Sequence, residues 1–169
     1  MKKILPLFLL LPLAAFSQHV QSDQTDDFGN LRRIATSRVE FKGMAQSLSG
    51  NITIREKDTL FYMNLIFRAG KATRTDEHTT VFLQLENGEV LQKFNQDKEK
   101  ELTATEPGFF VFSLDEKDKD KLTSFNVVGY TIKTANSTVD VKLNEQQQKA
   151  FYRTIRLLES QAASVASID

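Results

Sequence analysis

The longest apolar run after the first seventeen residues of this chain is Thr59–Ala69, TLFYMNLIFRA. As an extended strand it is largely apolar on both faces, one carrying Phe61, Met63, Leu65, Phe67 and Ala69 and the other Leu60, Tyr62, Asn64, Ile66 and Arg68. A strand that is apolar on both faces is normally central in a sheet and covered twice. The run therefore predicts the middle strand of the fold. It is too short, and too polar at Asn64 and Arg68, to cross a bilayer as a helix.

The N-terminus has the three parts of a secretory signal peptide. Two lysines precede an apolar segment, and small residues at Ala15 and Ser17 stand just before Gln18. This predicts a signal peptide over 1–17, cleavage before Gln18, and a bacterial protein exported to the periplasm or the medium, without a transmembrane segment after cleavage. An uncleaved anchor is the alternative, which the short apolar segment and Pro12 disfavour.

Composition narrows the class of protein further. Without the two lysines of the signal peptide, 22 acidic residues stand against 20 basic ones, so no basic field is present to attract nucleic acid. The chain has no cysteine, which excludes disulfides, thiolate metal sites and a lipid-modified N-terminal cysteine. Eleven of the thirteen phenylalanines follow the signal peptide, and with no tryptophan present we interpret most of them as core residues.

The rest of the chain divides into a leader and one domain. Residues 18–27 are polar and aperiodic, which predicts a flexible leader. Order is expected from Phe28-Gly29-Asn30 onward, and no linker or repeat divides residues 28–169. The run Phe109–Leu114 is apolar at both its odd and its even positions, and therefore on both faces of an extended strand. It predicts a second strand inside the sheet.

The best-defined hairpin joins Thr79–Glu86 to Glu89–Phe94 through Asn87-Gly88. Asn-Gly is the preferred pair for a two-residue turn, because both central residues of that turn need positive φ. The resulting register pairs residues that are apolar at five of six positions and are expected to face the core: Leu85 with Val90, Leu83 with Gln92, and Val81 with Phe94.

Two helices are predicted towards the C-terminus. Ser113 and Glu116 have the spacing of a capping box, which indicates a short helix with Leu122 facing inward; a solvated loop is the alternative. After a hairpin of Phe125–Lys133 and Thr138–Leu143, Asn144 caps an amphipathic helix over 144–160. Its apolar stripe consists of Phe151, Ile155, Leu158 and Ala162.

Few residues suggest catalysis or metal binding. The loop residues Asp76, Glu77 and His78 could supply metal ligands, but neighbours on one loop rarely converge without help from elsewhere. Glu86 and Glu89 are expected as solvated charges at the hairpin tip, with a cation site as the alternative. No nucleotide-binding, hydrolase or metalloprotease motif occurs, so no catalytic, cofactor-binding or metal residue is predicted. Tyr62, Tyr130 and Tyr152 are the only candidate binding residues, against core-edge packing as the simpler interpretation.

The layout resembles a broad group of small exported bacterial β-rich domains of unknown function. The shared features are Asp27–Asn30 leading into Ile34–Ser37, the hairpin Leu83–Gly88, the charged segment ending at Leu122 before Phe125–Val128, and the closing strand and helix. The resemblance implies export and a β-rich architecture, and it implies no functional residues.

These observations predict an α+β domain: an antiparallel sheet of about eight strands, forming a sandwich or partial barrel, packed by a C-terminal amphipathic helix. The leading functional hypothesis is a non-catalytic accessory domain whose partner is another exported or envelope protein. The first alternative is a carrier that encloses an apolar small molecule or lipid, and the second is a carboxylate-based hydrolase.

Overall fold

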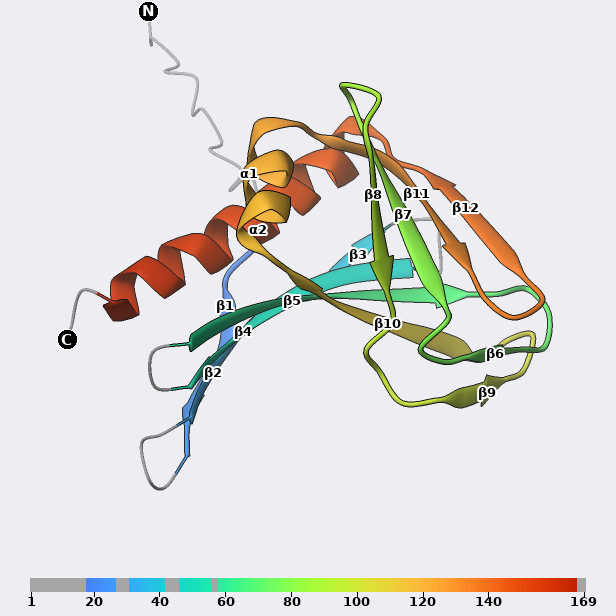
Figure 1. Ribbon diagram of the computed structural model, residues 1–169, viewed down its shortest axis with the longest axis horizontal. Coiled ribbons are helices and arrows are strands. Elements are labelled where there is room, and N and C mark those ends of the chain that lie inside the picture. The colour runs from blue at the N-terminus through green and yellow to red at the C-terminus, as the bar shows by residue number, and fades with distance from the viewer. Residues whose placement is uncertain (1–17, 27–30, 42–45, 56–57, 167–169) are drawn as a thin grey trace, which may run out of the picture.

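The computed structural model describes residues 18–26, 31–41, 46–55 and 58–166, which form an α+β fold of antiparallel sheets and two helices (Figure 1). The large sheet has the order β1-β2-β4-β5-β10, with β3 also paired to β4. Its strands are β1 (Val20–Thr25), β2 (Leu31–Thr36), β3 (Val39–Phe41), β4 (Gln46–Arg55), β5 (Asp58–Arg68) and β10 (Pro107–Leu114). The small sheet, in the order β12-β11-β7-β8, consists of β7 (Thr80–Leu85), β8 (Val90–Phe94), β11 (Val127–Lys133) and β12 (Thr138–Lys142). A two-stranded ribbon pairs β6 (Thr73–Thr75) with β9 (Lys100–Leu102).

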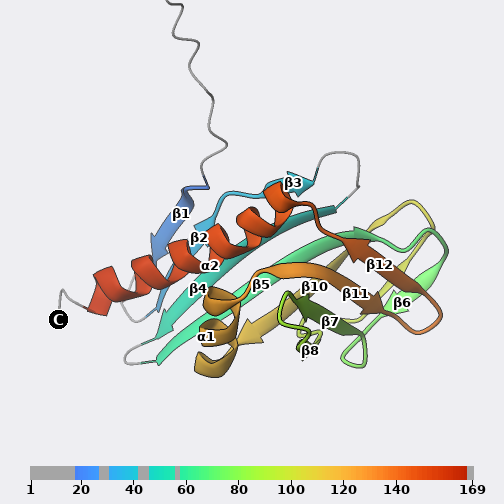
Figure 2. The ribbon, with the colours of Figure 1, turned by 90° about the horizontal axis from the view of Figure 1, so that it is seen from above.

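The helices and the small sheet lie on one side of the large sheet. Figure 1 shows α2 (Glu145–Ala166) and the small sheet above the ribbon of β5. Seen from above, α2 runs diagonally over the β1, β2 and β4 end of the sheet, with α1 (Glu116–Ser124) beside it (Figure 2). The predicted α+β architecture with a C-terminal helix packed on the sheet is confirmed, with more strands than the eight expected and without a closed barrel.

A single hydrophobic core fills the space between these layers. The ring of Phe151 on α2 lies 6.3 Å from that of Phe41 and 6.2 Å from that of Tyr130, so helix, large sheet and small sheet meet at one aromatic cluster. Tyr130 is fully buried and its hydroxyl donates to Gln46 Oε1 at 2.9 Å. The phenylalanines predicted as core residues mostly occupy this interior.

β5 is an interior strand of the large sheet, paired with β4 and β10, but it is covered on one face only. The row from Phe61 to Phe67 is buried against the helix and small sheet. The alternate row is open, with Leu60 47% exposed and Tyr62, Asn64 and Ile66 half-buried. The prediction of a strand covered on both faces is therefore wrong, because both covering layers pack on the same side of the large sheet.

β10 is the edge strand of the large sheet, so the prediction that Phe109–Leu114 lies inside a sheet is also wrong. Its outer edge is partly closed by a neighbouring loop. Gln96 N–H donates to the carbonyl of Val111 at 2.7 Å, and Val111 N–H donates to Asn95 Oδ1 at 3.1 Å. These two bonds satisfy the backbone of Val111, as an adjacent strand would.

α2 begins where the sequence predicts. Gln147 N–H donates to Asn144 Oδ1 at 3.0 Å, and Asn144 N–H donates to Gln147 Oε1 at 2.8 Å, which is a capping box. The stripe of Phe151, Ile155 and Leu158 is buried. The helix ends at Ala166, six residues beyond the predicted boundary. None of the helices that the structure describes combines the length and apolar character needed to cross a membrane.

α1 is a helix, and the alternative of a solvated loop is wrong. Leu122 is buried, as predicted. The capping box is formed by Asp115 and Asp118, two residues after the predicted pair of Ser113 and Glu116. Ser113 is still in β10, which ends at Leu114. The helix therefore begins after Asp115, which takes the capping position.

The β7–β8 hairpin forms with a register one residue away from the prediction. Leu85 N–H donates to the carbonyl of Glu89 at 2.9 Å and Gly88 N–H donates to that of Leu85 at 3.0 Å, so the loop has three residues and not two. Gly88 has φ of 87°, the left-handed residue that such a loop requires. Each β8 residue is therefore moved by one position, which turns Val90 and Phe94 outward, more than half exposed, and buries Leu91.

Residues Val20–Thr25 form β1, although the sequence predicts a flexible leader over 18–27. β1 pairs with β2, and Arg32 holds Asp23 with its Nη2 2.6 Å from Oδ2. The polar strand has no apolar period of its own, so its pairing with β2 is what makes it extended. The predicted signal peptide over 1–17 and the predicted start of order at Phe28-Gly29-Asn30 lie outside the described residues.

Candidate functional site

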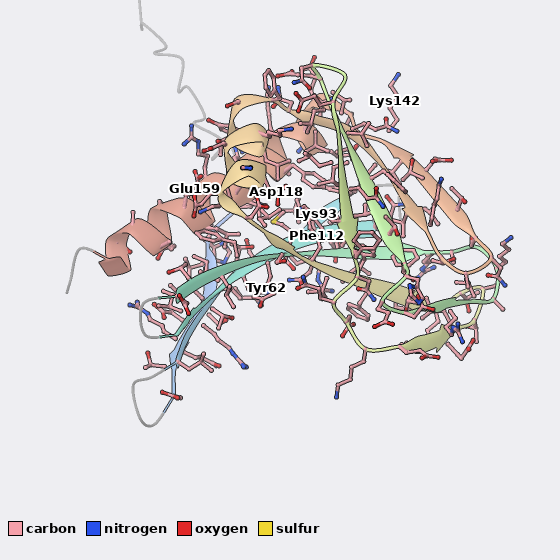
Figure 3. The ribbon with its side chains drawn as sticks, in the orientation of Figure 1. Tyr62, Lys93, Phe112, Asp118, Lys142 and Glu159 are labelled. Atoms are coloured by element: carbon pink, nitrogen blue, oxygen red, sulfur yellow. The ribbon has the colours of Figure 1, made fainter. Side chains whose placement is uncertain are left out.

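The outward face of the large sheet is the most distinctive surface of the described molecule. It consists of the side chains that point away from α2 and the small sheet, and we call it the open face. On β4, β5 and β10 its residues include Ser49, Asn51 and Thr53, then Asp58, Leu60, Tyr62, Asn64, Ile66 and Arg68, and then Phe109, Val111 and Ser113. On β2 it continues to Ala35 and Arg33, which pair with Asn51 and Thr53. Figure 3 shows Tyr62 on the side of the sheet opposite Lys93 and Asp118.

Cross-strand pairing places the apolar residues of the open face together. Ile66 on β5 lies directly opposite Phe109 on β10, and Val111 lies opposite Asn64. Phe109 is 39% exposed, close to the value for Leu60. Contiguous exposed apolar patches commonly mark contact surfaces, and the adjacent Ile66 and Phe109 form such a group on this face.

The polar residues at the centre of the open face are neutral. Asn64 Nδ2 donates to Ser49 Oγ at 3.5 Å, and Gln96 Nε2 donates to Ser113 Oγ at 2.8 Å. Asn51 lies opposite Tyr62. On β5 the charges stand at the two ends, at Asp58 and Arg68, both exposed. Arg33 on β2, which pairs with Thr53, is a further exposed charge on this face and lies away from its centre. The face can therefore bury apolar surface against a partner without desolvating a central charge.

The three candidate tyrosines do not converge. Tyr62 lies on the open face. Tyr130 is inside the core, where burial raises the pKa of its hydroxyl. Tyr152 is on α2, and its hydroxyl accepts from Arg156 Nε at 3.1 Å. Only Tyr62 belongs to the candidate site.

Asp76, Glu77 and His78 form a structural turn. Asp76 Oδ1 accepts from the N–H groups of His78 and Thr79 at 3.0 and 3.1 Å, and Asp76 Oδ2 lies 3.3 Å from an Arg74 nitrogen. Glu77 and His78 point into solvent. Within the ranges that the structure describes, no three acidic or histidine side chains are grouped so that they could hold a metal ion.

Glu86 and Glu89 at the hairpin tip are both exposed, as predicted for solvated charges, and each has its own partner. Glu86 accepts from the backbone and side-chain N–H of Asn126 at 3.1 and 3.0 Å, and these bonds lower its carboxyl pKa. Glu89 lies 2.7 Å from Lys121 Nζ on α1. Both carboxylates tie the hairpin to the helical segment, and they do not face one another as a cation site would require.

Other carboxylates also have structural partners. Asp118 Oδ2 pairs with Lys93 from β8 and accepts from Asp115 N–H at 3.0 Å. Hydrogen bonding from Asp118 N–H lowers the pKa of Asp115. Neither arrangement leaves two carboxylates flanking a cleft, which is the geometry expected of a hydrolase.

The two best-formed hollows in the described part of the molecule are open depressions. One, of about 310 Å³, is lined by Ala72, Thr73, Arg74, Glu101, Ala135 and Asn136. The other, of about 320 Å³, is lined by Thr123, Ser124, Phe125, Asn126 and Tyr152. Both are open to solvent and have linings of mixed polar and apolar character, so neither resembles the enclosed apolar chamber of a lipid carrier.

Sequence reasoning included Tyr62 among its candidates but missed Leu60, Ile66 and Phe109. The sequence did carry an indication of this face. Asn64 and Arg68 lie in the same alternate row of β5, and two polar residues in one row indicate a face in contact with water. The neutral polar row of Ser49, Asn51 and Thr53 on the adjacent strand carries the same signal. Comparison of this chain with protein-family models, with curated proteins and with solved structures found no match.

Proposed function

We propose that this chain is an exported, non-catalytic accessory domain that acts by binding another protein chain through its open face. The observation that carries the proposal is the group of Leu60, Tyr62, Ile66 and Phe109, which are partly exposed on the face that neither α2 nor the small sheet covers. Export is supported by the signal-peptide pattern of the first eighteen residues.

The chemistry of the face favours binding over catalysis. Its central polar groups are amides and hydroxyls, which neither exchange protons readily at neutral pH nor act as nucleophiles without a neighbouring base. The charged side chains on β5 are Asp58 and Arg68, ten residues apart at opposite ends of the strand. Contacts from such a face bury rings and aliphatic groups, with amides to fix the orientation.

Site-specific photocrosslinking tests the proposal. A photoreactive phenylalanine derivative replaces Tyr62, and in a matched variant it replaces Lys142, an exposed residue on the outer side of β12 (Figure 3). After expression in the native compartment and irradiation, we expect a protein adduct from position 62 and none from position 142. The adduct should be lost when Leu60→Asp is added, because a charge in the apolar row opposes burial. Equal labelling at both positions, or no protein adduct at position 62, would contradict the proposal.

A further inference from the structure

Every second residue of β5 points outward, and six residues make up this outward row. In order they are Asp58, Leu60, Tyr62, Asn64, Ile66 and Arg68. Their chemistry runs from an acid through an aliphatic, an aromatic, an amide and a second aliphatic residue to a base. All six belong to the open face, because successive even positions of a strand point to the same side.

This row is self-complementary about Met63, a buried residue in the middle of β5. Residues at equal distances from Met63 form chemically matched pairs: Asp58 with Arg68, Leu60 with Ile66, and Tyr62 with Asn64. If β5 were laid face to face on an antiparallel copy of itself, acid would meet base, aliphatic would meet aliphatic, and a phenol would meet an amide. This arrangement is produced by a two-fold axis that lies between the two faces, runs perpendicular to β5 and crosses it at Met63.

We infer that the partner of the open face is a second copy of this chain, with the two large sheets packed face to face and their β5 strands antiparallel. The inference rests on the proposed function and specifies its partner. Stacked sheets pack about 10 Å apart with their strands nearly aligned, so β5 of one copy can follow β5 of the other along its length. A two-fold dimer requires a surface patch that complements itself, and the β5 row has this property.

Charge selects the antiparallel arrangement over the parallel one. Asp58 and Arg68 are exposed, and neither takes part in an ion pair among the described residues. Antiparallel packing places each beside an opposite charge of the other copy. Parallel packing would place Asp58 on Asp58 and Arg68 on Arg68, and like charges facing each other are destabilising.

The flanking strands add no opposing charge near the axis. The same two-fold axis places β4 over β4 and β10 over β10. On β4 it brings Ser49 of one copy to Asn51 of the other, and on β10 it brings Val111 to Ser113. Phe109, beside Ile66, extends the apolar area towards Leu60 of the other copy. The centre of the interface is therefore neutral and its ends carry the opposite charges.

Charge reversal at the two ends of β5 tests the arrangement. Sedimentation velocity of the full chain, at about 1 to 300 µM, should show a monomer–dimer equilibrium for the wild type. Asp58→Arg and Arg68→Asp, each alone, should raise the dimer dissociation constant about tenfold or more, because each puts like charges at both ends of the interface. The double variant Asp58→Arg/Arg68→Asp should dimerise like the wild type, and so should an equal mixture of the two single variants.

Several results would overturn the inference. A wild type that stays monomeric across the range excludes the dimer, and a dimer that responds to neither single variant places its interface elsewhere. Far-ultraviolet circular dichroism of every variant checks that each one folds, and rescue in the double variant or the mixture cannot come from misfolded chains. A monomeric chain that still forms an adduct with a different protein at position 62 would contradict the second copy while leaving the proposed function in place.

Discussion

Gly50 on β4 lies directly against Leu158 on α2, so closely that a Cβ added to Gly50 would be 2.6 Å from Leu158 Cδ1. The same Cβ would be 2.9 Å from Thr154 Cγ2 and 3.3 Å from Met63 Sδ. α2 therefore crosses the large sheet at the one β4 position without a side chain. This contact sets how near the helix lies to the sheet, on the side opposite the open face.

Gly50→Ala should destabilise the fold by about 1–3 kcal/mol, because the new methyl group would overpack a site enclosed by Leu158 and Thr154. Urea unfolding followed by circular dichroism measures this loss. Leu158→Ala alone should cost about 2–5 kcal/mol by leaving a cavity. In the double variant the methyl group partly fills that cavity, so its cost should be smaller than the sum of the two. Strict additivity would show that the two side chains do not share the space.

Lys93 on β8 and Asp118 on α1 form an ion pair whose side chains are 18% and 10% exposed. Lys93→Met should cost about 1–3 kcal/mol, because it leaves the Asp118 carboxylate without its main charged partner in a mostly buried position. Lys142→Met is the matched control, since Lys142 is exposed and in no ion pair with a described residue, and it should change stability by less than about 0.5 kcal/mol. Similar losses for both variants, measured by thermal and urea unfolding, would contradict the anchoring role of the pair.

Elements with a strong local signal were predictable from the sequence. The Asn144 cap and the stripe from Phe151 to Leu158 specify α2 without reference to the rest of the fold. The apolar run of β5 specifies an interior strand, and its neighbours β4 and β10 pair on either side. In each case, the residues that form the element also carry the pattern that predicts it.

Features decided by distant contacts were not predictable. The register of the β7–β8 hairpin accompanies a contact between Glu86 and Asn126, forty positions apart in the chain, and Asn87-Gly88 suits both turn lengths. The helices and the small sheet decide which face of the large sheet is covered and which is open. The apolar sequence of β5 does not distinguish between the two faces. Tyr62 was identified because a tyrosine tolerates either environment, whereas Leu60 and Phe109 were assigned to the core by their hydrophobicity.

Gly88→Ala should destabilise the hairpin, because φ of 87° places the residue in the left-handed region that side chains disfavour. The expected cost is about 1–2 kcal/mol. Gln92→Ala, an exposed change on the same hairpin, should shift stability by less than about 0.5 kcal/mol. Hydrogen exchange should show faster exchange at Leu85 N–H in Gly88→Ala only, since that bond closes the loop. Unchanged exchange and stability would mean that the loop accepts a different turn.

The turn before β7 links stability to pH through Asp76. Burial opposes ionisation of its carboxyl, but the N–H of His78, the charge of Arg74 and the Thr79 hydroxyl and N–H together lower its pKa below the ordinary value of 3.8. A folded-state pKa below the unfolded one means that the native state binds the proton less readily. The carboxylate therefore stabilises the fold above the ordinary pKa, and this contribution is lost as the pH falls through the folded value.

Asp76→Asn should accordingly lower the free energy of unfolding at pH 7 and make the remaining stability less sensitive to acid. The wild-type and variant curves, from urea unfolding at intervals between about pH 7 and pH 2.5, should begin to converge below about pH 4 and meet only below the folded-state pKa, where the native carboxyl is protonated. Asp120→Asn removes the same charge from an exposed position on α1 that forms no ion pair with a described residue, and it controls for the change in net charge. Curves for Asp76→Asn and wild type that stay parallel across the whole range would show that the turn does not depend on the ionised form of Asp76.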